Sequence, residues 1–361
     1  MMGTRVWSKF LGSRNSFIKF PEECSARNVH EVGGKASSLG ELYKANAPVP
    51  PFFVVTSDGF KEFINFNNLH PLITRLETVR HDEAKMLQLL QDIRLRIMSA
   101  DFPPILGKEI QVAFQKIINS WQTVAVRSSA TLEDASEASF AGQYESFLGI
   151  RNTVQLFDAV RKCYASLFND RAVIYRNRMN RNHTDVHMAI VVQSLVRARS
   201  AGVMFTVNPL NGDPSVTVIE SSWGLGEAVV KGEVIPDSYV ISKVTGEVVK
   251  SHSSRNKPVK YEVLHDGTVV KVENPPEATE VSLSNKEAEL LAEIGNEMER
   301  YFGAPQDIEW VVDKRCKHPD NIFVVQSRPV TVNSTISKRS TQSSLTLMDR
   351  ILQTLLTGTR V

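Results

Sequence analysis

Apolar and polar residues alternate with two different periods along this chain. In the first half, apolar residues recur every three or four positions, which is typical of helices that pack by one face. The predicted helices cover 36–45, 57–66, 82–100, 106–119 and 154–179. Ser57 or Asp58 is the expected N-cap of the second helix. A short strand ending at Arg127 interrupts this helical half, and a loop is expected from there to Glu145.

From residue 187 onward the pattern changes to short runs rich in Val, Ile, Phe and Trp, which predicts strands. These runs cover 187–196, 201–209, 215–223, 237–243, 246–252 and 267–272. A helix at 286–302 then precedes a hairpin formed by "DIEWVVD" and "NIFVVQSR". A helical first half followed by a strand-rich second half predicts the α+β class, with the functional site between the halves.

Polar residues stand in the middle of both strands of this hairpin. With Glu309 facing Gln326, the antiparallel pairs would be Asp307–Arg328, Glu309–Gln326 and Val311–Val324. One face would then be core, formed by Ile308, Trp310, Val312, Phe323 and Val325. The other face is either an ordinary solvated surface or a site where carboxylate and amide oxygens hold a cation and a guanidinium faces phosphate.

Composition narrows the class of protein. The chain has 361 residues, of which 42% are hydrophobic and 23% charged, as in ordinary globular domains. A formal net charge of +2 and the lack of a basic patch with interleaved aromatics argue against a nucleic-acid partner. The three cysteines have no CxxC spacing, which disfavours a disulfide framework or a zinc site. No apolar run is long enough to span a bilayer, so no membrane partner is expected.

The first 21 residues are basic and contain no acid, which is compatible with a transit peptide for an organelle. They lack the apolar run of a secretory signal. A cytoplasmic location is therefore the default expectation, and organelle targeting is the alternative.

Two glycine- and serine-rich stretches suit phosphate binding. In "VAVRSSATLEDASEASFAGQYESF" a strand delivers Arg127 to a loop of small residues, where backbone N–H groups can approach phosphate oxygens. The acidic residues of this loop argue against it, and a plain surface loop is the alternative. In "VGGKASSLG", Lys35 follows two glycines at a helix start, a weak phosphate signal that does not match a P-loop.

Two further motifs carry less information. "WGLGE" is not a dinucleotide fingerprint, because no strand–helix unit of Rossmann length follows it, and its glycines are expected to allow tight packing or a turn. "VVQSLV" is an apolar strand interrupted by Gln193, and an ordinary buried strand is the simpler interpretation. The residues by themselves thus indicate a two-lobed protein that binds phosphate and metal.

Six stretches occur together in a characteristic order: "VGGKASSLGEL", "VAVRSSATLEDASEASFAGQYESFLGI", "IVVQSLV", "AGVMFTVNP", "SSWGLGEAVVKGEVIPDSYVI" and "PQDIEW…VVQSRPV". In this order they resemble the ATP-binding domain of the phosphoenolpyruvate synthase family. Pyruvate phosphate dikinase and rifampin phosphotransferase share this domain. The resemblance covers about residues 17–332.

The resemblance implies an ATP-grasp-type, two-lobed nucleotide-binding domain that holds ATP and Mg²⁺ between its lobes. It assigns phosphate contacts to Lys35, Arg127, Gly142 and Ser146, the adenine strand to Gln193 and Leu195, Mg²⁺ to Glu309 and Gln326, and the transferred phosphoryl group to Arg328. Among these, Lys35, Arg127 and Arg328 are the implied catalytic residues. Two residues depart from the family pattern: Phe52 stands where glycine is usual, and Ser146 where threonine is common.

The same resemblance divides the chain into an extension (1–16), an N-terminal lobe (17–192), a C-terminal lobe (193–332) and a last segment (333–361). That last segment resembles a linker and the beginning of a swivelling phosphohistidine domain, so the chain is expected to be a fragment or one half of a split enzyme. A separate phosphohistidine or substrate domain would be its partner.

The implied function is a kinase-type phosphotransferase that donates the β-phosphoryl group of MgATP to a histidine outside these residues. The alternatives are a rifampin-type small-molecule phosphotransferase, a nucleotide-binding module without catalysis, and an ATP-grasp ligase, whose motifs differ.

Overall fold

The computed structural model describes residues 16–130, 146–264, 266–274 and 280–330. Within these residues the chain forms two compact units. The first comprises 16–44, 50–130, 146–195 and 266–268, and the second comprises 45–49, 196–264, 269–274 and 280–330. Helices and antiparallel sheets occur in both, so the predicted α+β class is confirmed. None of the described helices is long and apolar enough to cross a membrane.

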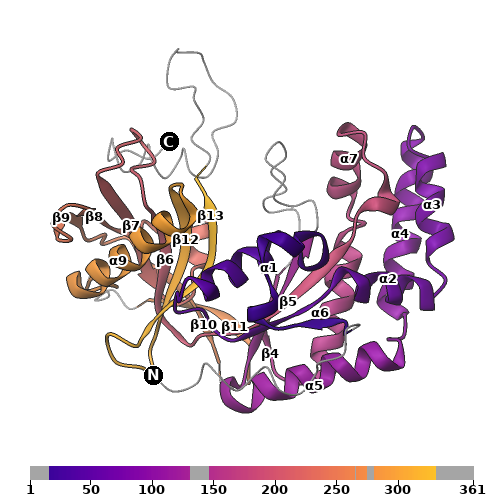
Figure 1. Ribbon diagram of the computed structural model, residues 1–361, viewed down its shortest axis with the longest axis horizontal. Helices are drawn as coiled ribbons and strands as arrows, with labels where there is room; N and C mark the ends of the chain where they lie inside the picture. Colours follow the sequence, from indigo (N-terminus) through magenta and orange to yellow (C-terminus); the bar gives the residue numbers. More distant parts are fainter. Residues whose placement is uncertain (1–15, 131–145, 265, 275–279, 331–361) are drawn as a thin grey trace. The chain divides into compact units, whose positions relative to one another are not determined.

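The first unit is built on a five-stranded sheet in the order β1-β2-β5-β3-β4 (Figure 1). Its strands are β1 (Ile18–Lys19), β2 (Phe52–Val55), β3 (Val124–Ala130), β4 (Ser146–Ile150) and β5 (Met188–Ser194). Its α-helices are α1 (Val29–Lys44), α2 (Ser57–Phe66), α3 (His70–Thr78), α4 (Glu83–Ser99), α5 (Pro104–Trp121), α6 (Thr153–Ser166) and α7 (Asp170–Arg178). Short 3-10 turns are η2 (Pro21–Glu23), η3 (Ala26–Asn28) and η4 (His183–Asp185).

Successive side chains of each strand point to opposite faces of this sheet, and the two faces differ in what packs on them. The residues Val124, Val126, Ile190 and Val192 join one large apolar core with side chains of α2, α4, α5 and α6. Burying these β-branched side chains stabilises the unit by roughly 1.5–3 kcal/mol each. The residues between them in sequence point to the other face, which carries α1.

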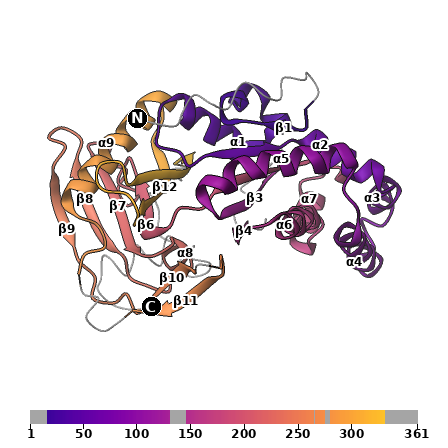
Figure 2. The same cartoon turned by 90° about the horizontal axis from the view of Figure 1, so that it is seen from below.

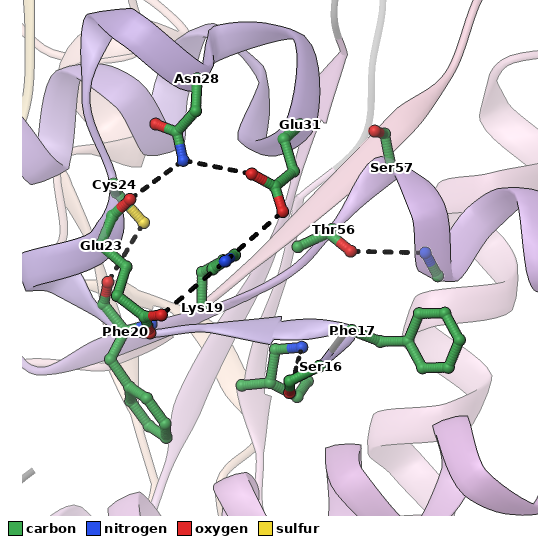
Figure 3. A network of polar contacts seen from close by, with 12 residues as sticks. Ser16, Phe17, Lys19, Phe20, Glu23, Cys24, Asn28, Glu31, Thr56 and Ser57 are labelled. Atoms are coloured by element: carbon green, nitrogen blue, oxygen red, sulfur yellow. Dashed lines mark hydrogen bonds and ion pairs between the residues drawn. The ribbon is translucent and has the colours of Figure 1, made fainter. Parts of the chain in front are cut away.

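A polar network holds the segment that leads into α1 (Figure 3). Lys19 lies 3.8 Å from Glu23 and 3.6 Å from Glu31. Asn28 Nδ2 donates to the Glu23 carbonyl at 3.0 Å and to the Glu31 carboxylate at 3.4 Å. Burial raises the pKa of the adjacent Cys24 thiol far above its ordinary value, so this cysteine stays protonated and unreactive. The network fixes where α1 begins relative to the sheet.

The second unit is built on a six-stranded antiparallel sheet in the order β13-β12-β6-β7-β8-β9. Its strands are β6 (Ala198–Phe205), β7 (Val216–Trp223), β8 (Asp237–Ser242), β9 (Val248–His252), β12 (Gln306–Asp313) and β13 (Ile322–Pro329). A separate ribbon pairs β10 (Val259–Val263) with β11 (Val269–Glu273). The helices are α8 (Glu227–Val230) and α9 (Asn285–Phe302).

Helix α9 covers one face of the six-stranded sheet (Figure 2). Ser284 caps it through a capping box with Glu287, and Gly303 ends it in the left-handed conformation. A Cβ added at Gly295 would lie 2.7 Å from Met204 Cε, so glycine lets the helix approach β6 closely. Met204 pairs laterally with Ile308 and Ile219, and this row of apolar side chains therefore faces α9.

A buried ion pair joins β8 to two loops of the second unit. Lys257 Nζ lies 2.6 Å from Asp237 Oδ1, and both side chains are fully buried. Asp237 also accepts hydrogen bonds from the backbone N–H of Ser254 and from the N–H and Oγ of Ser282. Because the carboxylate has these partners, the pair is compensated for the loss of water.

Several predicted elements need correction. The α2 cap is Thr56, whose Oγ1 accepts from the Gly59 N–H, and not Ser57 or Asp58. The predicted strand ending at Arg127 continues to Ala130, because Ser128, Ser129 and Ala130 pair with β5. Small polar residues suggest a loop there, but pairing partners distant in sequence extend the strand.

The predicted long helix over 154–179 is two helices, α6 and α7, interrupted at 167–169. The break exposes a backbone carbonyl at Leu167, which accepts a hydrogen bond from the buried Arg176 guanidinium. The elements α3, α8, β1, β2, β4 and β10 have no counterpart among the predicted elements. The helix predicted at 36–45 begins earlier, because α1 starts at Val29 and continues across a break from helical geometry at Gly33. The remaining predicted helices and strands are confirmed within a few residues at their ends.

We predict that Lys257→Met lowers the free energy of unfolding by about 3–5 kcal/mol, because it leaves Asp237 ionised and buried without its cation. Urea denaturation monitored by tryptophan fluorescence measures this loss. The matched control is Lys271→Met, since Lys271 pairs with Glu233 at 3.0 Å but is about half exposed, and about 0–1 kcal/mol is expected there. Equal losses in the two variants would contradict the assigned importance of the buried pair.

Candidate functional site

The hairpin β12–β13 pairs as predicted at its polar end. Asp307 lies opposite Arg328 and Glu309 opposite Gln326, so these two expected pairs are confirmed. The third expected pair, Val311–Val324, is wrong, because Val324 lies opposite Trp310. A β-bulge between Glu309 and Trp310 shifts the register by one residue.

The bulge also changes which side chains of β13 face the core. A one-residue shift moves every later side chain to the other face. Ile322 and Val324 are therefore buried beside Val312 and Trp310, whereas Phe323 and Val325, which the sequence pattern placed in the core, are only half-buried. The bulge thus lets one hairpin present an apolar core end and a polar end on the required faces.

Asp307 and Arg328 form an ion pair at the polar end of the hairpin. Arg328 Nε lies 2.8 Å and Nη2 2.7 Å from Asp307 Oδ2. The carboxylate is largely buried, whereas the Arg328 side chain is 51% exposed. Burial raises the pKa of Asp307 above its ordinary value, although the charge of Arg328 opposes this shift. Asp307 therefore orients a guanidinium that remains accessible to a ligand.

Glu309 and Gln326 lie on the sheet face opposite α9. Glu309 pairs laterally with Val203 of β6, and the neighbouring residue Ile308 belongs to the row that faces α9. Because successive side chains alternate, the Glu309–Gln326 pair points away from the helix. The two residues are direct cross-strand neighbours, and both are half-buried.

The carboxylate of Glu309 and the amide oxygen of Gln326 are hard oxygen donors of the kind that Mg²⁺ prefers. Among the described residues, no group of three or more His, Cys, Asp or Glu side chains could hold a metal ion. Two protein oxygens fit the usual way in which Mg²⁺ is bound, with phosphate oxygens and water completing the octahedron. The residues therefore fit a metal that arrives with a phosphate ligand.

In the first unit, the two glycine- and serine-rich motifs meet at Gly33. Gly33 interrupts α1 with φ +76° and ψ 169°. A Cβ added there would lie 2.1 Å from the Ser129 carbonyl oxygen, so only glycine allows α1 to approach β3. Ser129 Oγ accepts a hydrogen bond of 3.2 Å from the backbone N–H of Ala36. This contact caps the helical segment after the kink and places half-buried Lys35 in its first turn.

Arg127, Ser146 and Gln193 point to the same face of the first sheet. Arg127 pairs laterally with Ser146 of β4 and with Val191 of β5, two residues before Gln193. Their neighbours Val126, Phe147 and Val192 belong to the apolar core. Alternation therefore directs these three side chains to the face that carries Ser129 and α1.

Gln193 and Leu195 lie at the end of β5. Gln193 is buried, and its Nε2 has no hydrogen-bond partner among the described residues. The N–H of Leu195 donates to the Thr123 carbonyl at 3.0 Å, so that donor is already used. A buried amide donor without a partner costs about 1–3 kcal/mol, and a ligand with an acceptor group would remove this cost.

Residues 29–348 match the protein family described as "Pyruvate phosphate dikinase, AMP/ATP-binding domain". This chain belongs to that family. It is 39% identical over 329 residues to a protein of Methanocaldococcus jannaschii named "Probable phosphoenolpyruvate synthase", covering 89% of this chain and 27% of the relative. A "Probable phosphoenolpyruvate synthase" of Methanothermobacter thermautotrophicus is 40% identical over 322 residues, covering 87% and 46%. The chain thus spans less than half the length of these relatives.

A solved structure of D-alanyl-alanine synthetase A from Vibrio cholerae aligns with a TM-score of 0.33 at 12% identity, over 84% of this chain and 56% of that one. A likeness this low assigns neither fold nor residues. Membership in the AMP/ATP-binding domain family rests on the sequence match.

The structure places the residues predicted for the site in two groups. Lys35, Arg127, Ser146, Gln193 and Leu195 belong to the first unit, and Glu309, Gln326 and Arg328 to the second. Gly142 lies outside the described residues. The antiparallel register of the hairpin had already predicted Asp307 opposite Arg328. The sequence did not single out Ser129 as a helix cap, and it carries no comparable signal for that role.

We predict that Gly33→Ala destabilises the protein by about 3 kcal/mol, because the added Cβ combines a positive φ with a clash against backbone. Gly212→Ala is the matched control, since Gly212 has φ +74° but a Cβ there would meet no atom within 4 Å. The control should lose only about 1 kcal/mol. Thermal unfolding of both variants measures the difference, and equal losses would contradict the close approach of α1 to β3.

Proposed function

We propose that this chain binds MgATP and donates the β-phosphoryl group to a histidine in a domain outside these residues, as the ATP-binding module of a phosphoenolpyruvate synthase-type dikinase. The observation that carries this proposal is the Glu309–Gln326 oxygen pair beside the Asp307-oriented Arg328, on the sheet face opposite α9. Membership in the AMP/ATP-binding domain family supports it. In such a reaction the α-phosphate stays in AMP, the β-phosphoryl group is bound to the histidine, and the γ-phosphoryl group passes to water and is released as inorganic phosphate.

The proposed roles follow from charge and donor type. Phosphoryl transfer depends mainly on positioning and on neutralising the charge of the phosphates. Glu309 and Gln326 would hold Mg²⁺, while Arg328 would donate to the phosphoryl oxygens with its guanidinium oriented by Asp307. When bound, Mg²⁺ neutralises phosphate charge. These residues occupy rigid strands, which suits a site that must position a ligand.

The first unit would supply the remaining contacts. Lys35, at a helix start, and Arg127, at mid-strand beside Ser146, are cations suited to phosphate oxygens. The Gln193 amide donor, which has no partner among the described residues, suits an adenine nitrogen, and the Leu195 carbonyl suits the exocyclic amine. We assign Gly142 to the phosphates on the resemblance alone. On these assignments the fold is ATP-grasp-type, with the lobes divided near residue 193.

Phosphorus-31 NMR of the purified chain with MgATP, with and without pyruvate, tests the reaction. The expected products are AMP and inorganic phosphate, with water accepting the phosphoryl group slowly when no histidine domain is present. Formation of ADP would contradict the dikinase assignment. Unchanged ATP together with measurable binding would favour a nucleotide-binding module without catalysis of its own.

We predict that Arg328→Ala reduces phosphoryl transfer by about 10³–10⁵-fold while MgATP still binds, because the guanidinium acts on charge that develops during transfer. Quantitative ³¹P NMR gives the rate, and calorimetry gives the affinity. Arg300→Ala, an exposed arginine on α9, is the matched control and should leave both unchanged. Equal rates for Arg328→Ala and the unmodified protein would refute the assignment.

We also predict that Glu309→Ala weakens the Mg²⁺-dependent part of ATP affinity by about 10–100-fold, while affinity measured without Mg²⁺ changes little. Calorimetric titration with and without Mg²⁺ separates the two parts. Glu297→Ala, on the exposed surface of α9, serves as control. A loss of affinity that is the same in both conditions would argue for a general effect on folding and against metal binding.

A rifampin-type small-molecule phosphotransferase is the alternative of the same class. The phosphoenolpyruvate synthase type and the rifampin type share the ATP-binding domain, and they differ in the molecule that finally accepts the phosphoryl group.

A further inference from the structure

Glu220, an acidic residue of the second unit, lies on the same sheet face as Glu309. Glu220 of β7 pairs laterally with Val203 of β6, and Val203 pairs with Glu309 of β12. Laterally paired residues of an antiparallel sheet point to the same face. Gln326, Glu309, Val203 and Glu220 therefore form one row across four strands, directed away from α9.

The adjacent residues confirm this orientation. Ile219 and Ser221 flank Glu220, and both face the α9 side. Ile219 lies in the row with Met204, and Ser221 Oγ lies 2.7 Å from the Ser282 hydroxyl just before the helix. The "WGLGE" loop crosses the Glu220 side, since a Cβ added at Gly226 would lie 3.9 Å from Ala201 Cβ. Ala201 is on that face because it is two residues from Val203.

Glu220 is buried, with 6% of its surface exposed. Among the described residues, none forms a side-chain hydrogen bond or an ion pair with it. Nearby on the same face, Ser222 Oγ is also buried without a hydrogen-bond partner among the described residues. Buried polar groups are nearly always satisfied in folded proteins. A buried carboxyl and a buried hydroxyl without partners among the described residues, on the face that carries the Glu309–Gln326 pair, are the arrangement expected where a polar ligand completes the site.

The charged groups of the described elements around β7 are paired with other residues: Arg199 of β6 with Glu287, and Asp237 of β8 with Lys257. The lateral neighbours of Glu220 are Val203 and Ser238. The charged groups of the adjacent α8 and β10 are engaged in exposed or half-exposed ion pairs, namely Glu227 with Lys231 and Lys260 with Glu262. The charged groups of α9 lie on the face of the sheet opposite to Glu220. Desolvation alone raises the pKa of Glu220 to about 7.

From this geometry we infer that Glu220 is a further binding residue of the nucleotide site, facing the outer hydration shell of the Mg²⁺ held at Glu309 and Gln326. The inference rests on the proposed function. Neighbouring strands are about 4.8 Å apart, so the Cα atoms of Glu220 and Glu309 are separated by about 10 Å. This spacing is too wide for a shared inner coordination sphere but suits contact through metal-bound water. The carboxylic acid gives up its proton to solvent when the magnesium nucleotide binds.

The sign of the pH effect follows from this linkage. A carboxyl with a raised pKa is mainly protonated at pH 6 in the free protein, and the bound cation favours its ionised form. Binding at pH 6 therefore releases nearly one proton from Glu220, and the apparent affinity is about tenfold weaker than at pH 8. ATP itself also titrates in this range, so the comparison must be made between protein variants under identical conditions.

The test is calorimetric titration of the full chain with Mg²⁺ and a non-hydrolysable ATP analogue, at pH 6 and pH 8, in buffers of different ionisation heat. At pH 6 the unmodified protein should release close to one proton more than Glu220→Gln. Its affinity ratio between pH 8 and pH 6 should be about tenfold larger than that of the variant. Without Mg²⁺, the two proteins should not differ in proton release.

Glu293→Gln, on the exposed surface of α9, is the matched control and should behave like the unmodified protein. Identical proton release and pH dependence in Glu220→Gln and the unmodified protein would overturn the role of Glu220 while leaving nucleotide binding established. Absence of binding by the unmodified protein at both pH values would instead overturn the proposed function. If Glu220→Gln does not fold, the unmodified protein alone still tests the inference. Its proton release at pH 6 is then compared with the release that occurs when Mg²⁺ binds the ATP analogue without protein, and a release no greater than that would contradict the role of Glu220.

Discussion

Both units of this protein depend on the alternation of side chains across a β-sheet. Each sheet directs its apolar core positions to one face, and the positions one residue out of step point to the other face. In the first unit these positions hold Arg127 and Gln193, and in the second Glu309 and Glu220. Polar residues can occupy central strands here because their neighbours in sequence supply the core. Apolar core positions and polar positions thus alternate along the same strands of each sheet.

This constraint explains why small departures from regular structure matter. The bulge in β13 allows Ile322 and Val324 to join the core while Gln326 and Arg328 remain on the polar face. Without the extra residue, the side chains at one end of the hairpin would face the opposite side of the sheet. Gly33 has a comparable role in the first unit, because it allows α1 to lie against β3 and places Lys35 in the turn that follows. Both features set where charged side chains stand relative to a rigid sheet.

The charged groups of the second unit differ in how far the protein itself provides them with partners. Asp237 and Lys257 satisfy each other and their surroundings completely, which is typical of a pair that holds loops together. Asp307 orients Arg328 but leaves the guanidinium exposed. Glu220 is buried and has no partner among the described residues, which is costly unless a ligand arrives. Of the three carboxyl groups, that of Glu220 is the one to which the described residues offer no partner.

The sequence by itself determined the α+β class, most of the helices and strands, and the family, because these depend on local periodicity and on ordered motifs. It also determined the pairs Asp307–Arg328 and Glu309–Gln326, since both follow from one assumption about an antiparallel hairpin. Only the tertiary structure decided the bulge, the extension of β3 to Ala130, the break between α6 and α7, and the approach of Gly33 to Ser129. These features arise from contacts between residues far apart in the chain, which periodicity cannot register. Glu220 belongs with them, because its relation to Glu309 passes through Val203, on a strand that comes between them in space and not in sequence.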